Sequence, residues 1–267
     1  VYLPILQPSQ SMINKKSNPD LTDCRVCPIG LKDARKITVA KHYMGTWPQG
    51  AKVAFGLFKK SKCIGVMVAG YSPTTERKVA KWCRKIERSQ YIELQRTWIS
   101  DEMGHNTESW MMARVMRIFK RSGIWLVLTH SGGCKDDVGF IFQASGWLYF
   151  GCDPCNDFYE TARGEYKNLV SAMRFGRVPK EILKQGQQAI GEHLFGEGKI
   201  VNARRHLYIY PINRGLRQRL KKQTLPFPKN PAIYRLDQKW HPANGVVSTG
   251  LKPAKVSDSI PDNSSIL

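Results

Sequence analysis

The pattern of apolar residues between positions 91 and 121 predicts a strand, a polar turn and an amphipathic helix. Apolar and polar residues alternate from Tyr91 to Ile99, which is the period of a half-buried strand. The polar turn from Ser100 to Ser109 contains Asn106, a good N-cap residue. An apolar stripe at helical spacing follows, made of Met111, Met112, Val115, Met116 and Phe119. The alternation divides the strand between two faces, Ile92, Leu94, Arg96 and Trp98 on one and Glu93, Gln95 and Thr97 on the other.

The same patterns along the rest of the chain predict a mixed order of strands and helices. Strands are expected at residues 24–29, 52–59, 62–71, 124–129, 147–151 and 206–211, and helices at 31–43, within 73–88, at 138–144 and within 166–191. This order is typical of an α/β protein, here one domain at 23–212 with a central mixed sheet flanked by helices. Residues 1–22 are expected to form a flexible lead, 213–240 a basic extension and 241–267 a disordered tail.

The chain carries a large positive charge, with 42 Lys and Arg against 21 Asp and Glu, a net of +21. Such a charge indicates a polyanionic partner, and double-stranded DNA is the first choice. The basic residues concentrate at 77–88 and 199–239, where interleaved aromatic residues allow base stacking as well as phosphate contact. The candidate nucleic-acid-binding residues are Arg77, Lys78, Lys81, Arg84, Arg204, Arg205, Arg214, Arg217, Arg219, Lys221 and Lys222.

A membrane is a poorer candidate partner than nucleic acid. No stretch approaches the length and apolarity of a membrane span, and no basic helix has a bulky apolar face. The first residues lack the charged start and small-residue cleavage site of a signal peptide. We therefore expect a cytoplasmic protein, in the host cell if a phage encodes it.

The seven cysteines are an odd number, which fits a reducing cytoplasm better than a disulfide framework. Two C-x-x-C pairs stand out, Cys24 with Cys27 and Cys152 with Cys155. Four thiolates are a donor set for a structural zinc ion, provided that the fold brings together pairs 125 residues apart. Free thiols are the preferred interpretation, and the zinc site is the alternative.

The turn that leads into the helix after Asn106 is also a candidate phosphate-binding site. The backbone N–H groups and the partial positive charge of a helix N-terminus suit a phosphate group. The alternative is an ordinary strand, turn and helix with solvated charges.

The order of these elements resembles the GCN5-related N-acetyltransferase (GNAT) fold, and the details resemble the Mom family of phage DNA-modification proteins. The matching pieces cover about two thirds of the chain. They are the His42-Tyr43 pair with Pro48, the hairpin AFGLFKKSKCIGVMVAG, the strand ELQRTWI, the helix opening at Asn106 to Ser109, the stretch GFIFQASGWLYFG, and RRHLYIYPIN with the basic residues that follow it.

The resemblance implies chemistry on DNA, since the family's founding activity converts adenine to a carbamoylmethylated form that restriction enzymes do not cut. It implies an acyl-CoA-type donor, with acetyl-CoA suspected, and its pyrophosphate would lie on the turn from Gly104 to Ser109. The cofactor-binding residues implied are Arg96, Gly104, Asn106 and Ser109, and the catalytic ones are His42, Tyr43 and Asp137. The family match also implies iron at His42.

The chain departs from the family pattern near Asp137. The family has an acidic residue where this chain has Gly132, a histidine at Asp137 and a tyrosine at Phe142. Neighbouring Asp136 and His130 are candidates to compensate.

The residues also have structural interpretations. The His42-Tyr43 pair is typical of a helix cap, Ser109 of a first helical turn, and Arg96 of an ion pair with Glu93 or Asp101. Three functions therefore stay open: an enzyme that modifies bases in DNA, an N-acyltransferase acting on a small amine or protein, and a DNA-binding protein without catalysis. The first is preferred because it uses both the charge and the candidate site.

Overall fold

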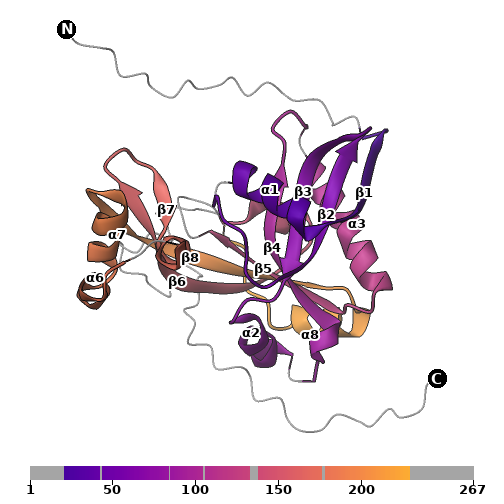
Figure 1. Cartoon of the computed structure of the whole chain (residues 1–267). Coiled ribbons are helices and arrows are strands. Elements are labelled where there is room, and N and C mark those ends of the chain that lie inside the picture. Colours follow the sequence, from indigo (N-terminus) through magenta and orange to yellow (C-terminus); the bar gives the residue numbers. More distant parts are fainter. Residues whose placement is uncertain are drawn as a thin grey trace.

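The computed structural model describes residues 21–228 apart from 43, 84, 105, 133–137 and 176–177 (Figure 1). In this part of the chain, one sheet contains eight strands in the order β1-β2-β3-β4-β5-β8-β6-β7. Neighbouring strands are antiparallel except for the parallel pair β4 and β5. The strands are β1 Cys24–Ile29, β2 Ala51–Lys59, β3 Lys62–Gly70, β4 Tyr91–Ile99, β5 Leu126–Gly132, β6 Leu148–Thr161, β7 Tyr166–Asn168 and β8 Gly198–Pro211.

The helices lie between these strands or after them, so the predicted α/β class with a mixed, helix-flanked sheet is confirmed. No helix in the described ranges is both long and apolar enough to cross a membrane. The helices are α1 Leu31–Lys41, α2 Thr75–Trp82, α3 Thr107–Arg121, α4 Phe140–Ala144, α5 Leu169–Phe175, α6 Lys180–Gln185, α7 Gln187–Phe195 and α8 Arg214–Lys221, with a 3₁₀ turn at Arg88–Gln90.

Apolar residues on both faces of the sheet hold the helices. On one face, Phe55 and Met67 pack with the apolar stripe of α3 and with Phe142 of α4. Neighbouring residues in a strand point to opposite faces, so Val68 lies on the other face, where it packs against Ala34 of α1. The helices α2 and α8 cover that second face further along the sheet. We call the two surfaces the α3 face and the α1–α2 face.

A β-bulge in β4 changes which face its side chains reach. Leu94 pairs with Ala69 and Arg96 pairs with Val68, so Gln95 is an extra residue in β4. Because paired residues of antiparallel strands point to the same face, Leu94 stays on the α3 face while Arg96 lies on the α1–α2 face.

The sequence-based division of this strand is therefore correct before the bulge and wrong after it. Ile92 and Leu94 both pack in the core with α3. Arg96 and Trp98, expected on the same face, pair instead with residues of the α1–α2 face. One inserted residue reverses the alternation, and nothing in the apolar pattern marks the insertion.

The strands β6 and β8 are much longer than the segments predicted at 147–151 and 206–211. They pair from Leu148↔Ile209 to Thr161↔Gly198 and form a ribbon that extends from the sheet. The far end of the ribbon carries α6 and α7 as a projecting lobe (Figure 1). Tyr159 packs there with hydrophobic residues of α5 and α7. The polar residues within β6 hide its strand character in the sequence.

Candidate functional site

The parallel strands β4 and β5 stay paired over only part of their lengths. Their described pairing runs from Tyr91↔Leu126 to Leu94↔Thr129, and both strands continue beyond the last pair. The bulge in β4 lies immediately after that pair. The carboxyl ends of the two strands therefore separate after Leu94 and Thr129. Open sheets of α/β proteins commonly bind ligands at the carboxyl ends of parallel strands.

His42 and Arg96 lie within electrostatic range of each other on the α1–α2 face, beyond this separation. His42 is the C-cap residue of α1, and its Nδ1 accepts a hydrogen bond from the Met44 N–H at 3.1 Å. The Arg96 guanidinium donates to the Gln95 carbonyl at 2.7 Å and to the Thr46 hydroxyl at 3.4 Å. Burial, and then the charge of Arg96, lower the pKa of His42 to about 4. The fold thus brings together a predicted catalytic residue and a predicted cofactor residue, with the imidazole neutral at pH 7.

The predicted cofactor residues Gly104, Asn106 and Ser109 lie where α3 begins. Asn106 is at the N-cap with a left-handed φ of 71°, but its side chain makes no capping hydrogen bond. The hydroxyls of Thr107 and Ser109 instead donate to the carbonyls of Gly104 and Asn106, at 2.8 and 2.9 Å. The turn is therefore held by the hydroxyls, and the expectation that the Asn106 side chain caps the helix is corrected.

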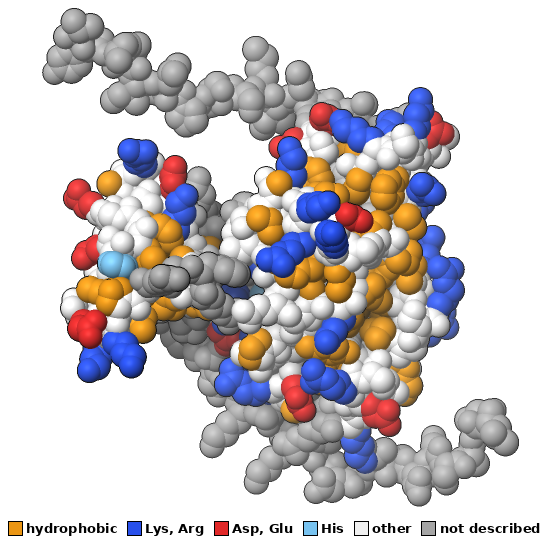
Figure 2. All heavy atoms as spheres, viewed as in Figure 1, with side chains coloured by type: hydrophobic (Ala, Val, Ile, Leu, Met, Phe, Trp, Pro, Cys, Tyr) orange, Lys and Arg blue, Asp and Glu red, His pale blue; other side chains and the backbone are white. Residues whose placement is uncertain are grey.

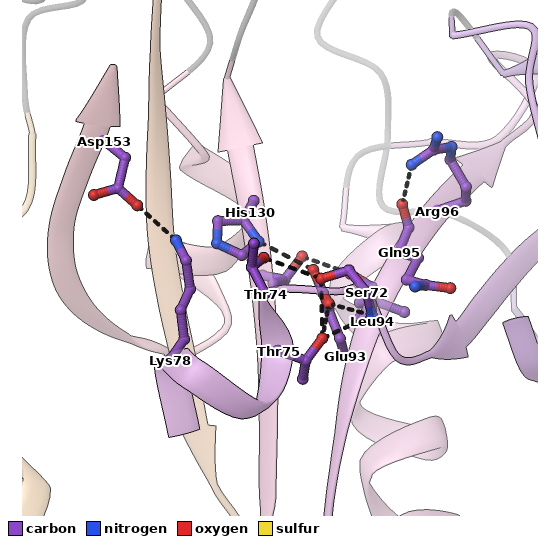
Figure 3. Close-up of polar contacts among 11 residues, drawn as sticks. Ser72, Thr74, Thr75, Lys78, Glu93, Leu94, Gln95, Arg96, His130 and Asp153 are labelled. Atoms are coloured by element: carbon purple, nitrogen blue, oxygen red, sulfur yellow. Dashed lines mark hydrogen bonds and ion pairs between the residues drawn. The ribbon is translucent and has the colours of Figure 1, made fainter. Parts of the chain in front are cut away.

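A buried polar cluster lies beside this site on the α1–α2 face (Figure 3). The two oxygens of the Glu93 carboxylate have different partners. Oε1 lies 3.1 Å from Nδ1 of His130, and Oε2 accepts from the Ser72 N–H at 3.1 Å and from the Thr75 hydroxyl. Glu93 was considered as an ion-pair partner for Arg96, and the structure pairs it with His130 instead.

The cluster extends to an ion pair between α2 and β6. Nζ of Lys78 donates to Oδ2 of Asp153 at 2.6 Å, and the Lys78 side chain is buried. Burial lowers the pKa of Lys78, against the opposing effect of Asp153. Lys78 was predicted to bind nucleic acid, but its charge is directed inward to Asp153 and not to the outer surface.

The Glu93 cluster is not recognisable as a unit from the sequence. Its members come from β4, β5, α2, the loop before α2 and β6, so no spacing connects them. The one signal in the sequence is an acidic residue among the apolar residues Tyr91, Ile92 and Leu94, because a buried carboxylate requires hydrogen-bond donors.

The two basic stretches of the sequence converge in the fold. Val79 and Cys83, in and just after α2, pack in the same apolar cluster as Leu216 and Leu220 of α8. Burial raises the pKa of Cys83 to about 11, against the opposing effect of Arg219 on α8. The exposed cations of the two helices thus lie near one another as an α2–α8 basic surface, made of Arg77, Lys81, Arg214, Arg219, Lys221 and Lys222.

The remaining predicted nucleic-acid residues differ from these six. Arg217 is half-buried, donates to the Gly146 carbonyl at 3.0 Å and lies 5.5 Å from the centre of the Tyr210 ring. Arg205 is half-buried near Lys78 and Asp153. Arg84 and the side chain of Arg204 lie outside the described part of the structure.

The described residues near His42 do not fit a bound iron ion. No group of three or more His, Cys, Asp and Glu side chains that could hold a metal comes together in the described part of the chain. The Arg96 cation, which helps to lower the pKa of His42, would also repel a metal cation there. Tyr43 and Asp137, the other predicted catalytic residues, lie outside the described residues.

The sheet order separates the two cysteine pairs that the sequence offered as zinc ligands. Cys24 and Cys27 lie in β1, and Cys152 and Cys155 lie in β6, six strand positions away. At the usual spacing between strands this is a separation of roughly 30 Å. Cys24, Cys27 and Cys152 form no disulfide among the described residues, and the side chain of Cys155 is not among those described.

Phe142, which stands where the family has a tyrosine, is a core residue here. Its ring packs against Trp147 and Tyr208, with centroids 5.1 and 5.5 Å away. The next residue, Gln143, donates to the Tyr208 hydroxyl at 3.1 Å. The structure therefore gives Phe142 a packing role. Gly132 ends β5, and the stretch that follows it lies outside the described residues.

Comparison with known proteins identifies the family. The Mom protein family matches residues 23–229, so the chain belongs to that family and the resemblance seen in the sequence is confirmed. The methylcarbamoylase Mom of Escherichia phage Mu is 26% identical over 216 residues, which are 78% of this chain and 84% of the phage protein.

Solved acetyltransferase structures are similar in arrangement at very low sequence identity. A polyamine N-acetyltransferase from Drosophila melanogaster is 12% identical with a TM-score of 0.41, over 71% of this chain and 100% of its own. A GNAT-family acetyltransferase from Elizabethkingia anophelis with bound acetyl-CoA is 8% identical with a TM-score of 0.39, over 71% of this chain and 98% of its own.

Proposed function

We propose that this protein is a DNA-modifying transferase that adds a carbamoylmethyl-type or acyl-derived group to the N6 amino group of adenine, and so protects the DNA from restriction. Membership of the Mom family and similarity to a phage methylcarbamoylase support the proposal. The observation that carries it is the proximity of His42 and Arg96 beyond the point where β4 and β5 separate. These residues are 54 positions apart in the sequence, and the charge of Arg96 nevertheless contributes to the low pKa of His42.

The proposed donor is an acyl-CoA-type thioester, with acetyl-CoA as the first compound to try. Its pyrophosphate would bind the backbone N–H groups at the start of α3, where the helix dipole favours an anion. Arg96 would act as the fixed cation near the reacting end of the donor. Iron has no part in this proposal, because the described surroundings of His42 do not fit it.

The proposed acceptor is double-stranded DNA, bound on the α2–α8 basic surface. Its six exposed cations can each neutralise a phosphate, and they lie on the sheet face that also carries His42 and Arg96. Figure 2 shows acidic and basic side chains mixed on the projecting lobe, whereas basic ones predominate on the rest of that view. We therefore propose that the lobe is not the main DNA contact. An adenine inside a duplex is out of reach of a protein site, so the base would have to leave the stack.

A competition assay tests the proposal. Purified protein receives acetyl-CoA labelled in the acyl group, with duplex DNA and a polyamine present together, and label is measured in each acceptor. We expect label in DNA and not in the polyamine. Label in the polyamine alone would indicate an ordinary N-acyltransferase, and salt-sensitive DNA binding without any transfer would indicate a DNA-binding protein.

A further inference from the structure

The Glu93 carboxylate is held in one orientation by donors from three elements. The His130 ring, the Ser72 N–H and the Thr75 hydroxyl all contact it, and its side chain is only 8% exposed (Figure 3). Burial opposes ionisation, but the hydrogen bonds from His130, Ser72 and Thr75 lower the pKa of Glu93 to about 2. Glu93 is therefore a carboxylate throughout the physiological pH range.

An ionised carboxylate fixes the tautomer of its imidazole partner. The carboxylate can only accept hydrogen bonds, so Nδ1 of His130 must carry the proton that lies between them. Burial lowers the pKa of His130, and the positive charges of Lys78 and Arg205 lower it further, while Glu93 raises it. The ring is therefore neutral at pH 7, and Nε2 bears a lone pair.

That lone pair is the unusual feature of the cluster. Nε2 of His130 is a buried atom, and no residue in the described ranges makes a hydrogen bond with it. Burying a polar atom without a partner costs free energy, and such atoms persist mainly where a function or a water uses them. The His130 side chain as a whole is 13% exposed and the nearby Asp153 side chain is 39% exposed, so the surface lies close to the ring although Nε2 itself is covered.

The position of the pair coincides with the separation of the strands. Leu94 of β4 and Thr129 of β5 form the last described pair of the two strands. Glu93 comes immediately before Leu94, and His130 comes immediately after Thr129. Glu93 lies on the α1–α2 face, which Arg96 shares because of the bulge. Glu93, His130 and Arg96 therefore lie on the same face of the sheet.

We propose that His130 is the general base of the transfer reaction and that Glu93 is its positioning residue. This inference rests on the proposed function and assigns its proton acceptor. His130 also offers a basic group two residues before Gly132, where the chain departs from the family pattern.

The proposed step balances as an acyl transfer from a thioester. The adenine amino nitrogen attacks the carbonyl carbon, and a new N–C bond forms while the C–S bond breaks and leaves its electron pair on sulfur. The nitrogen loses one proton to Nε2 of His130, which then returns it to the thiolate or to solvent. Adenine nitrogen is a weak nucleophile because its lone pair is delocalised, so removal of this proton assists the attack. Glu93 stabilises the imidazolium that forms.

The test compares His130→Gln and Glu93→Gln with wild type, and His193→Gln, a change to an exposed histidine on α7, is the control. Transfer to duplex DNA is followed from pH 4.5 to 9, with DNA affinity and thermal unfolding measured on each protein. We expect His130→Gln to lower kcat by about 10² to 10⁴-fold with little change in DNA affinity. The fall in wild-type kcat on acidification, centred below the ordinary histidine pKa of 6.5, should disappear in this variant. Glu93→Gln should lower kcat less and shift that pH dependence.

A second measurement does not depend on the variants folding. The ¹⁵N chemical shifts of the His130 ring in wild-type protein should show protonated Nδ1 and unprotonated Nε2 near pH 7. An Nε2–H tautomer, or a folded His130→Gln protein with wild-type kcat and pH profile, overturns the inference while leaving the proposed function intact. A wild-type protein that transfers nothing to DNA overturns the proposed function, and the role of His130 with it.

Discussion

Lys78 Nζ lies 2.6 Å from Asp153 Oδ2, and this ion pair joins α2 to the start of the β6–β8 ribbon. The lysine is buried and the aspartate is partly exposed. The pair therefore belongs to the folded framework of the α1–α2 face, although the lysine comes from a stretch that reads as part of a DNA-binding surface.

Removing the acidic partner should destabilise the protein. Asp153→Asn leaves the buried Lys78 charge without its counter-ion, and we expect a loss of about 1 to 3 kcal/mol, reduced from the fully buried case because Asp153 is partly exposed. Chemical denaturation at pH 7 measures the change. Glu102→Gln, which removes the exposed pair with Lys62, should alter stability by less than about 0.5 kcal/mol. Equal effects from the two substitutions would contradict the structural role of Lys78.

The α2–α8 basic surface should determine the salt dependence of DNA binding. Replacing Lys81 and Arg219 together with Gln should reduce the slope of log affinity against log salt by about 2, since each phosphate contact contributes about 0.9. The matched control replaces Lys180 and Lys184 on α6 of the projecting lobe with Gln. A greater loss from the α6 pair would move the DNA interface to the lobe.

The effect of the Arg96 charge on the pKa of His42 should be measurable. Burial is the larger cause of the low His42 pKa and Arg96 the second, so Arg96→Gln should raise that pKa but leave it below 6.5. The titration of the His42 ring by NMR gives the value directly. Arg114→Gln on α3, where the guanidinium stacks on Trp110, is the control. An unchanged His42 titration in Arg96→Gln would mean that the two side chains do not form one site.

Glu93 should contribute to stability in a defined pH window. Its pKa is lowered to about 2 in the folded protein, from an ordinary value of 4.5. A group with a depressed folded pKa stabilises above its unfolded pKa and loses this contribution as the pH falls through the folded value. The stability difference between wild type and Glu93→Gln should therefore shrink by about 3 kcal/mol between pH 5 and pH 2. A constant difference across that range, measured by denaturation, would show that Glu93 is not ionised in the fold.

The sequence predicted the elements well because apolar periodicity directly reflects burial. The hairpin of β2 and β3 and the helix α3 follow from it, and the ends differ by a few residues. The length of β6 was missed, since its outer half is polar and packs on the small core of the lobe around Tyr159.

The candidate site was only partly predictable for a different reason. His42 and Arg96 were identified singly through the family resemblance, but their proximity depends on the bulge at Gln95, which reverses the alternation of β4. The partnership of Glu93 with His130 depends on parallel pairing between strands 35 residues apart, which no local pattern reveals. Contacts across the sheet depend on the register in which the strands pair, and sequence patterns alone do not specify that register.

The most direct test of the proposed function is nucleoside mass spectrometry of DNA from cells that express the protein, with His42→Ala as the paired variant. The proposal predicts a new deoxyadenosine species of increased mass in cells with the wild-type protein, which disappears with His42→Ala although that variant still binds DNA. Unmodified deoxyadenosine in cells that contain folded, DNA-binding wild-type protein and an ample supply of acyl-CoA would contradict it.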